Sequence, residues 1–232
     1  MSTIGDNVKE VLHKVEKARK RSINGEEVTI IAVTKTHDNQ VIQDVKDLGF
    51  TSIGENKVQE LVKRMEVFED SLEYHMIGRL QSNKVKYIYD KVALIHSLDR
   101  HSLAKEIDKR GRNSEITVPC LIQVNVSKEK TKGGVFPEDL ESFVEECLKY
   151  KNIRIMGLMT MAPHIDDEKK LRSYFQKMYK MREIIAKKGY NELDMKYLSM
   201  GMSNDYEIAI EEGANMVRIG SSLFGKRDYS KL

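Results

Sequence analysis

The stretch Val28-Thr-Ile-Ile-Ala-Val-Thr34, which Lys35 follows, decides how this sequence folds. A nearly continuous run of β-branched and apolar residues predicts a strand buried on both faces, which is typical of a parallel sheet. Before it, residues 4–21 carry apolar side chains at helical spacing, and residues 39–48 after it predict a second helix. The strand is therefore expected to lie between two helices.

The same unit of strand and helix recurs along the chain. The further strands are expected at Phe50–Ile53, Tyr74–Ile77, Val92–His96, Val118–Val126, Ile153–Leu158, Lys196–Ser199 and Asn215–Ile219. The helices between strands are expected at Asn39–Leu48, Lys57–Phe68, Asn83–Tyr89, Leu103–Arg110, Glu138–Tyr150, Glu168–Lys187 and Tyr206–Glu212. Eight alternating units predict an α/β protein, a single-domain (β/α)8 TIM barrel over residues 1–232 with an extra N-terminal helix. An open doubly wound sheet is the alternative, but no GxGxxG turn follows the first strand.

The connections between these elements carry their own signals. A left-handed C-cap is expected where a glycine follows a helix, as at Gly49, Gly111, Gly189 and Gly213. The helix after the seventh strand should begin near Asn204, whose Asn204-x-x-Glu207 spacing resembles a capping box. The polar connection 127–134, after the fifth strand, is either a surface loop or a lid over a site.

Composition excludes several classes of protein. The 39 Lys and Arg residues balance 36 Asp and Glu residues to a net charge of +3, without the concentrated basic face of a nucleic-acid binder. No apolar run approaches the ~18 residues that span a bilayer, so no membrane partner is expected. The amino terminus has no apolar signal core. Cys120 and Cys147 are too few for a disulfide scaffold or a CxxC metal site, and we expect a cytoplasmic monomer without a metal.

Lys35 is the first candidate functional residue, because ligand sites in this fold lie at the carboxyl ends of the strands. Partial desolvation there would lower the pKa of its ammonium group, and a neutral amine attacks carbonyls. The alternative is a lysine that merely extends its side chain to solvent.

The ends of the seventh and eighth strands add a second candidate feature. Gly201 with Ser203, and Gly220 with Ser221, each combine a close backbone approach with a hydroxyl at a helix start. Two such starts side by side predict a phosphate site, although serines at these positions can also simply cap their helices. A phosphate site facing Lys35 suggests a phosphorylated carbonyl ligand.

Six blocks in register, spanning about Val28 to Gly225, resemble the YggS/PROSC family of pyridoxal phosphate homeostasis proteins. The blocks are Ala32-Val-Thr-Lys35, Ile53-Gly-Glu-Asn56, His75-Met-Ile-Gly-x-Leu-Gln-Ser-Asn-Lys84, Gly157-Leu-Met-x-Met161, Leu198-Ser-Met-Gly-Met-Ser203 and Val217-Arg-Ile-Gly-x-x-Leu-Phe-Gly225. Arg79 departs from the pattern, since proline or histidine is expected more often at that position of the third block.

The resemblance implies a pyridoxal 5′-phosphate barrel similar to the amino-terminal domain of bacterial alanine racemase. In that case Lys35 would form the internal aldimine, Asn56 would flank the ring and Arg218 would face the pyridine nitrogen. Ser203, Gly220 and Ser221 would hold the phosphate. The other residues expected in the cofactor site are Met159, Ser199, Gly201 and Met202.

Three functions are compatible with these residues: a carrier that stores, buffers or delivers the cofactor to apoenzymes, an amino-acid racemase, and a class I aldolase-like barrel. The aldolase needs an acid or base, for which Glu55 is the one nearby candidate. The racemase resemblance implies a second domain with a catalytic tyrosine, whereas this sequence ends at Leu232 with only Tyr229 beyond the last strand. We therefore predict a carrier without substantial turnover, with weak racemase-like side activity left open. His13, His37, His101 and His164 show no metal-ligand spacing, and His75 is interpreted as structural.

Overall fold

The chain folds into a closed barrel of eight parallel strands in the order β1 to β8, as the computed structural model shows for residues 3–129, 131–190 and 193–225. The strands are β1 Thr29–Val33, β2 Ser52–Glu55, β3 Glu73–Met76, β4 Leu94–Leu98, β5 Val118–Gln123, β6 Ile153–Met159, β7 Leu193–Met202 and β8 Met216–Ile219. The α-helices are α1 Ile4–Arg19, α2 Asn39–Asp47, α3 Val58–Phe68, α4 His101–Asn113, α5 Leu140–Cys147, α6 Glu168–Ala186, α7 Tyr206–Glu211 and α8 Ser221–Phe224. Three 3-10 turns join them: η1 Glu69–Ser71, η2 Ser82–Tyr87 and η3 Pro137–Asp139.

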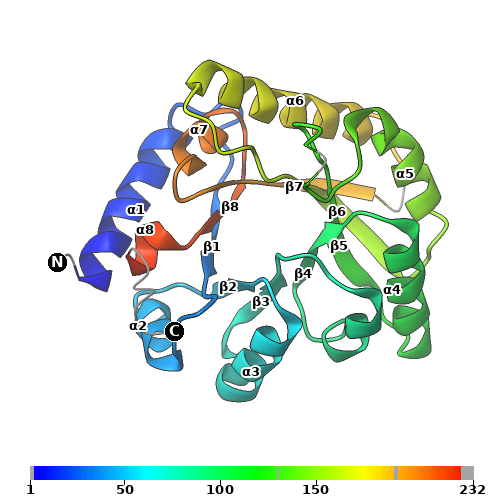
Figure 1. Ribbon diagram of the computed structural model, residues 1–232, viewed down its shortest axis with the longest axis horizontal. Helices are drawn as coiled ribbons and strands as arrows, with labels where there is room; N and C mark the ends of the chain where they lie inside the picture. Colours follow the sequence, from blue (N-terminus) through cyan, green and yellow to red (C-terminus); the bar gives the residue numbers. More distant parts are fainter. Residues whose placement is uncertain (1–2, 130, 191–192, 226–232) are drawn as a thin grey trace.

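The helices form a ring outside the strands (Figure 1), so the predicted TIM barrel with an extra N-terminal helix is confirmed. The barrel closes where β1 pairs in parallel with β8, from Thr29 opposite Met216 to Ala32 opposite Ile219. Apolar side chains fill its interior as a cluster separate from the layer between strands and helices. This interior cluster consists of Ile31, Val33, Ile77, Leu94, Leu121, Met159 and Met216.

Helix α1 lies against α7 and α8 at the left of Figure 1, outside the β7–β8 corner. A capping box between Thr3 and Asp6 starts it, and its apolar stripe of Val8, Val11 and Val15 is buried. The Asn7 side-chain amide donates a hydrogen bond of 3.0 Å to the carbonyl of Leu223, the third residue of α8. The extra helix therefore supports the short helix that follows the last strand.

Several predicted boundaries differ from the structure. The helix expected at Asn83–Tyr89 is the 3-10 turn η2, because so short a segment closes with i to i+3 bonds such as Lys84 N–H to Gln81 (2.9 Å). The helix expected at Glu138–Tyr150 is shorter, since a 3-10 turn beginning at Pro137 precedes α5. Strand β7 starts at Leu193 rather than Lys196, because Leu193 pairs with Ile155 of β6.

The predicted helix ends are partly right. Gly49, Gly189 and Gly213 have φ of 94°, 65° and 93°, as a left-handed cap requires. The C-cap prediction is wrong for Gly111, which lies inside α4. A Cβ there would lie 2.7 Å from the Ile116 carbonyl oxygen, which explains the glycine. The left-handed residue after α4 is Glu115, with φ of 55°. None of the described helices is long and apolar enough to cross a lipid bilayer. The segment Asp228–Leu232, with Tyr229, lies outside the described residues.

Candidate functional site

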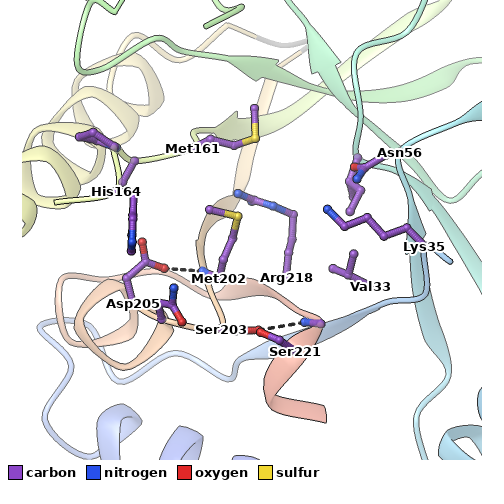
Figure 2. A pocket seen from close by; sticks show the side chains of 15 residues that line it. Val33, Lys35, Asn56, Met161, His164, Met202, Ser203, Asp205, Arg218 and Ser221 are labelled. Carbon is purple, nitrogen blue, oxygen red and sulfur yellow. Dashed lines mark hydrogen bonds between the residues drawn. The ribbon is translucent and has the colours of Figure 1, made fainter. Parts of the chain in front are cut away.

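A cavity of about 580 Å³ opens at the carboxyl ends of the strands, which is the face where TIM barrels bind ligands. Figure 2 shows its lining side chains converging from β1, β7, β8 and the loops that follow β2 and β6. The lining consists of Val33, Lys35, Asn56, Ile77, Met161, Ala162, Pro163, His164, Met202, Ser203, Asn204, Asp205, Arg218, Gly220 and Ser221.

Lys35 enters this cavity from the end of β1. Its side chain is half-buried and points toward Asn56 and Arg218 (Figure 2), while Val33 and Ile77 of the barrel interior line the cavity below. Because the preceding strand is buried from Ile31 to Val33, the backbone that carries Lys35 is fixed by packing. The amine is thus presented at a defined place in an apolar-floored site.

The turn between β8 and α8 brings a set of hydrogen-bonding groups to the opposite wall. The Ser203 hydroxyl oxygen accepts from the backbone N–H of Gly220 (3.1 Å) and of Ser222 (3.2 Å), and the Ser222 hydroxyl donates to the Ser203 carbonyl (3.2 Å). Ser203 therefore satisfies the amino terminus of α8, not of α7, which it precedes in sequence. The hydroxyls of Ser203 and Ser221, which line the cavity beside these bonds, can donate to an oxyanion.

Helix α7 begins at Tyr206, as in the predicted range Tyr206–Glu212, and not near Asn204, so the capping box from Asn204 to Glu207 is wrong. Its N-cap is Asp205, whose side chain makes no cap bond to the helix. Instead the Asp205 carboxylate turns back and accepts from the N–H of Met202 at 2.5 Å. This bond closes the turn at the end of β7 and leaves Asp205 on the cavity wall.

Arg218 projects from β8 with its guanidinium buried. It donates to the Ser199 hydroxyl (2.6 Å) and to the Thr160 carbonyl (2.8 Å), which join β8 to β7 and to the end of β6. Burial lowers the pKa of Arg218 to about 10, and the nearby Asp205 carboxylate opposes that shift. The guanidinium thus keeps its charge at neutral pH.

A chain of buried hydrogen bonds runs from Arg218 across the barrel. His96 Nδ1 lies 3.1 Å from Ser199 Oγ, and His96 Nε2 lies 3.1 Å from His75 Nδ1. Because burial lowers the pKa of His75 to about 4 and that of His96 well below its usual value, both rings are neutral at pH 7. His75 is buried and does not line the cavity, and its interpretation as a structural residue stays a prediction.

Arg218 sets the direction of this chain, because a guanidinium can only donate. If the Ser199 hydroxyl donates onward to His96, then His96 Nε2–H donates to His75, and one group, His75 Nε2–H, is left unpaired. The reverse direction leaves two groups unpaired, the Ser199 hydroxyl hydrogen and the His75 lone pair. Among the described residues of this hydrogen-bond chain, His75 Nε2 is the one buried polar atom without a hydrogen-bond partner. The first direction is favoured, since each unpaired buried group costs about 1–3 kcal/mol.

Seven of the ten predicted site residues line the cavity: Lys35, Asn56, Met202, Ser203, Arg218, Gly220 and Ser221. Ser199 lies beneath it and holds Arg218. Met159 does not line it but packs in the barrel interior, and Met161, two residues on, takes the lining position. Gly201 does not line it either: its φ is 91° and a Cβ would lie 2.7 Å from that of Ala209, so the glycine serves packing against α7.

Two ionisable lining residues are not among those that the sequence predicts. His164 is interpreted from the sequence as structural and Asp205 is not singled out, yet both lie on the same wall of the cavity (Figure 2). Burial raises the pKa of Asp205, while the Met202 N–H, Arg218 and His164 act against that rise. The signal that could have found them is their place, since each follows a strand at the carboxyl face.

Glu55, the acid that the aldolase alternative needs, does not line the cavity. It is buried and accepts hydrogen bonds from the Thr34 hydroxyl (2.7 Å) and from Arg64 Nε (3.5 Å). Burial raises the pKa of its carboxyl group, and the Thr34 and Arg64 contacts oppose that rise.

The loop 127–134 contacts the rim of the cavity, because Lys132 Nζ donates a hydrogen bond of 3.2 Å to the carbonyl of Ala162. That this loop moves as a lid stays a prediction.

Comparison with known proteins identifies the family. The model of the alanine racemase N-terminal domain matches residues 7–228. A protein of Aquifex aeolicus named "Pyridoxal phosphate homeostasis protein" is 45% identical over 97% of this chain and 98% of its own, and one of Helicobacter pylori with the same name is 40% identical over 92% and 95%. The structure of PipY from Synechococcus elongatus with PLP bound is 27% identical, with a TM-score of 0.83 over 96% of this chain and 100% of that one. The predicted resemblance is confirmed: this chain belongs to the alanine racemase N-terminal domain family and, within it, to the pyridoxal phosphate homeostasis proteins.

Proposed function

We propose that this protein binds pyridoxal 5′-phosphate in the cavity at the carboxyl ends of the strands and holds it on Lys35. The cofactor supplies an aldehyde, which condenses with a primary amine, and a phosphate group. The observation that carries the proposal is that one cavity contains both the Lys35 amine and the Ser203–Gly220 turn. Its volume of about 580 Å³ also fits a small cofactor.

The relatives support this proposal. The Aquifex and Helicobacter proteins are named for pyridoxal phosphate homeostasis, and the PipY structure is described with PLP bound. The blocks that carry Lys35, Asn56, Ser203 and Arg218 lie within the residues matched by the family. Nothing in the fold separates these four residues, since all of them line the same cavity.

Each residue has a role that follows from its chemistry. The Lys35 amine would hold the aldehyde group, whose oxygen leaves as water on condensation. Ser203, Gly220 and Ser221 would hold the phosphate. The Ser203 and Ser221 hydroxyls can donate to it, whereas the Gly220 N–H donates to Ser203 in the structure and would have to change partner. Asn56 and Met202 also line the cavity and would lie beside the ring. Ser199 holds the Arg218 guanidinium in place.

Arg218 makes a carrier the favoured function over an enzyme. A guanidinium that stays charged and only donates would leave the ring nitrogen of the ligand unprotonated, because two positive charges in contact repel. An unprotonated ring is a poor sink for the electrons that amino-acid chemistry releases. We therefore propose storage, buffering or delivery of the cofactor to apoenzymes, by a monomer in the cytoplasm, without substantial turnover.

The test of binding is the visible spectrum together with chemical mapping. Wild-type protein with the cofactor should show a yellow absorption band, and borohydride reduction followed by peptide mass mapping should place the adduct on Lys35. Lys35→Ala should abolish both, whereas Lys86→Ala, an exposed lysine outside the cavity, should change neither. An adduct on a lysine other than Lys35 contradicts the proposal.

The test of the carrier function is proton exchange on alanine. Wild-type protein saturated with cofactor is incubated with L-alanine in deuterated water, and the α-deuterium content and chirality are followed. We expect little or no racemisation. Turnover at ordinary enzyme rates, ~1–10³ s⁻¹, would establish a racemase instead.

A further inference from the structure

A second cavity opens on the same face of the barrel, beside the one that contains Lys35. It also measures about 580 Å³ and lies where β2, β3 and β4 lead into their loops. Asn56 lines both cavities. Gly78 shapes the boundary, because a Cβ at this position would lie 2.3 Å from the Asn56 carbonyl oxygen, so only glycine lets the two loops approach. The proposed cofactor-binding role does not account for this cavity.

Positive charge is what distinguishes the second cavity. Lys57, Arg79, Lys84 and Arg100 line it, and no carboxylate does. Arg100 is fixed by Asp99 (2.6 Å) and by the Leu80 carbonyl (2.7 Å). Among the residues that the structure describes, no ion pair involves the other three cations. Unneutralised cations that converge on a concave surface favour an anionic ligand.

The uncharged groups of the lining narrow the kind of anion. Side-chain amides of Asn56, Gln59, Gln81 and Asn83 and the hydroxyl of Ser82 add several donors. The N-cap residue of α3, Lys57, makes no side-chain cap bond, so the first N–H groups of that helix add to the positive potential. The apolar side chains of Met76 and Leu80 are buried beneath these polar groups.

We propose that this second cavity binds the phosphate group of a small organic phosphate, independently of Lys35. Arginine and lysine, together with amide donors, match the three acceptor oxygens of a phosphate monoester. A concave site of this volume accepts a small molecule rather than an extended acidic chain. Arg79 contributes one of the cations that no ion pair among the described residues neutralises.

The probe for this proposal is glycerol 3-phosphate, titrated into ¹⁵N-labelled protein at fixed ionic strength and followed by amide NMR shifts. We expect saturable shifts at Val58, Gln59 and Ser82 and at the Arg79 side-chain Nε–H, whereas uncharged glycerol should cause none. Arg79→Gln and Lys84→Gln should each weaken the affinity by about tenfold, the scale of one charge-assisted hydrogen bond.

Lys86→Gln is the matched control, because Lys86 lies on the same 3-10 turn as Lys84 but does not line the cavity. It should bind the probe as wild type does. Unchanged amide shifts elsewhere in each variant verify that the barrel is folded. Shifts confined to Gly220 and Ser222 mean that the probe binds only the first cavity, and they overturn the proposal. Wild-type affinity of both Arg79→Gln and Lys84→Gln overturns it as well. Saturation of the second cavity by a hexaglutamate peptide but not by glycerol 3-phosphate also overturns it, in favour of an acidic protein segment.

Discussion

Lowering the pH from 7.5 to 5 should destabilise the barrel through its two buried histidines. Burial lowers the pKa of His75 to about 4, and it lowers that of His96 in the same direction. A histidine in the unfolded chain titrates near ~6.5. Below that pH the unfolded chain binds protons that the buried rings of the folded barrel do not bind. The contribution of the neutral histidines to the free energy of unfolding is therefore fully present above pH ~6.5 and is lost as the pH falls toward the pKa of the folded state.

The size of the effect follows from the His75 value. A pKa difference of one unit corresponds to ~1.4 kcal/mol, so the full difference between ~6.5 and about 4 amounts to ~3.4 kcal/mol below pH 4. At pH 5 ~2 kcal/mol of it has been lost. Since domains are stable by only ~5–15 kcal/mol, this loss is measurable. His96 adds to it with the same sign.

Urea unfolding followed by circular dichroism at pH 7.5, 6 and 5 measures this effect. His75→Asn keeps an acceptor near His96 but removes one titrating group. The variant should therefore lose about ~2 kcal/mol less stability than wild type between pH 7.5 and 5. His13→Gln, on the exposed side of α1, is the control for losing a histidine outside the buried chain. If wild type and His75→Asn lose the same free energy over this range, His75 is not the group responsible and the reasoning fails.

Three further outcomes can be measured. Ser203→Ala should weaken binding of pyridoxal 5′-phosphate by ~1–3 kcal/mol in a fluorescence titration, but leave binding of pyridoxal, which lacks the phosphate, nearly unchanged. Equal losses for both ligands would mean that Ser203 does not contact the phosphate. In the same urea experiment, Gly201→Val should lower the free energy of unfolding by ~2–5 kcal/mol, because φ is 91° and a Cβ would lie 2.7 Å from that of Ala209. Gly25→Ala is the control: φ is 63° but the space around it is open, so the loss should be only ~1–2 kcal/mol. Long-range ¹⁵N NMR at pH 7 should find His75 and His96 neutral with the proton on Nε2, and Nδ1–H signals would reverse the direction derived from Arg218.

The order of elements could be predicted from the sequence because the strands are long apolar runs and the helices repeat every 3.6 residues. The boundaries were less accurate where tertiary contacts decide them. Strand β7 begins at Leu193 because it pairs with β6, and the register between these strands shifts near Gly157, whose absent side chain lets Tyr197 approach. Gly111 fits inside α4 because Asn152 packs closely against it. Such contacts join residues distant in sequence, so periodicity does not reveal them.

The site residues likewise fall into those that the sequence predicts and those that depend on tertiary contacts. Lys35, Ser203 and Arg218 lie at strand ends, and the barrel fold alone brings strand ends to one face. The lining by Met161, His164 and Asp205 depends instead on how the loops after β6 and β7 fold, as the bond from Met202 N–H to Asp205 illustrates. The contact between His75 and His96 depends on the register of β3 and β4. Spacing along the chain predicts neither of these.

The buried chain from His75 to Arg218 also explains why polar groups occupy a region that apolar side chains could fill more stably. Arg218 carries a full charge that burial makes costly, and Ser199 and the Thr160 carbonyl satisfy it directly. Ser199 can orient its hydroxyl for this purpose only if another acceptor takes its hydrogen, and His96 Nδ1 is that acceptor in the favoured direction. His96 is oriented in turn by His75, at the cost of one unpaired N–H deep in the barrel. The unpaired group belongs to His75, which does not line the cavity, and the guanidinium that does line it keeps both its charge and its position.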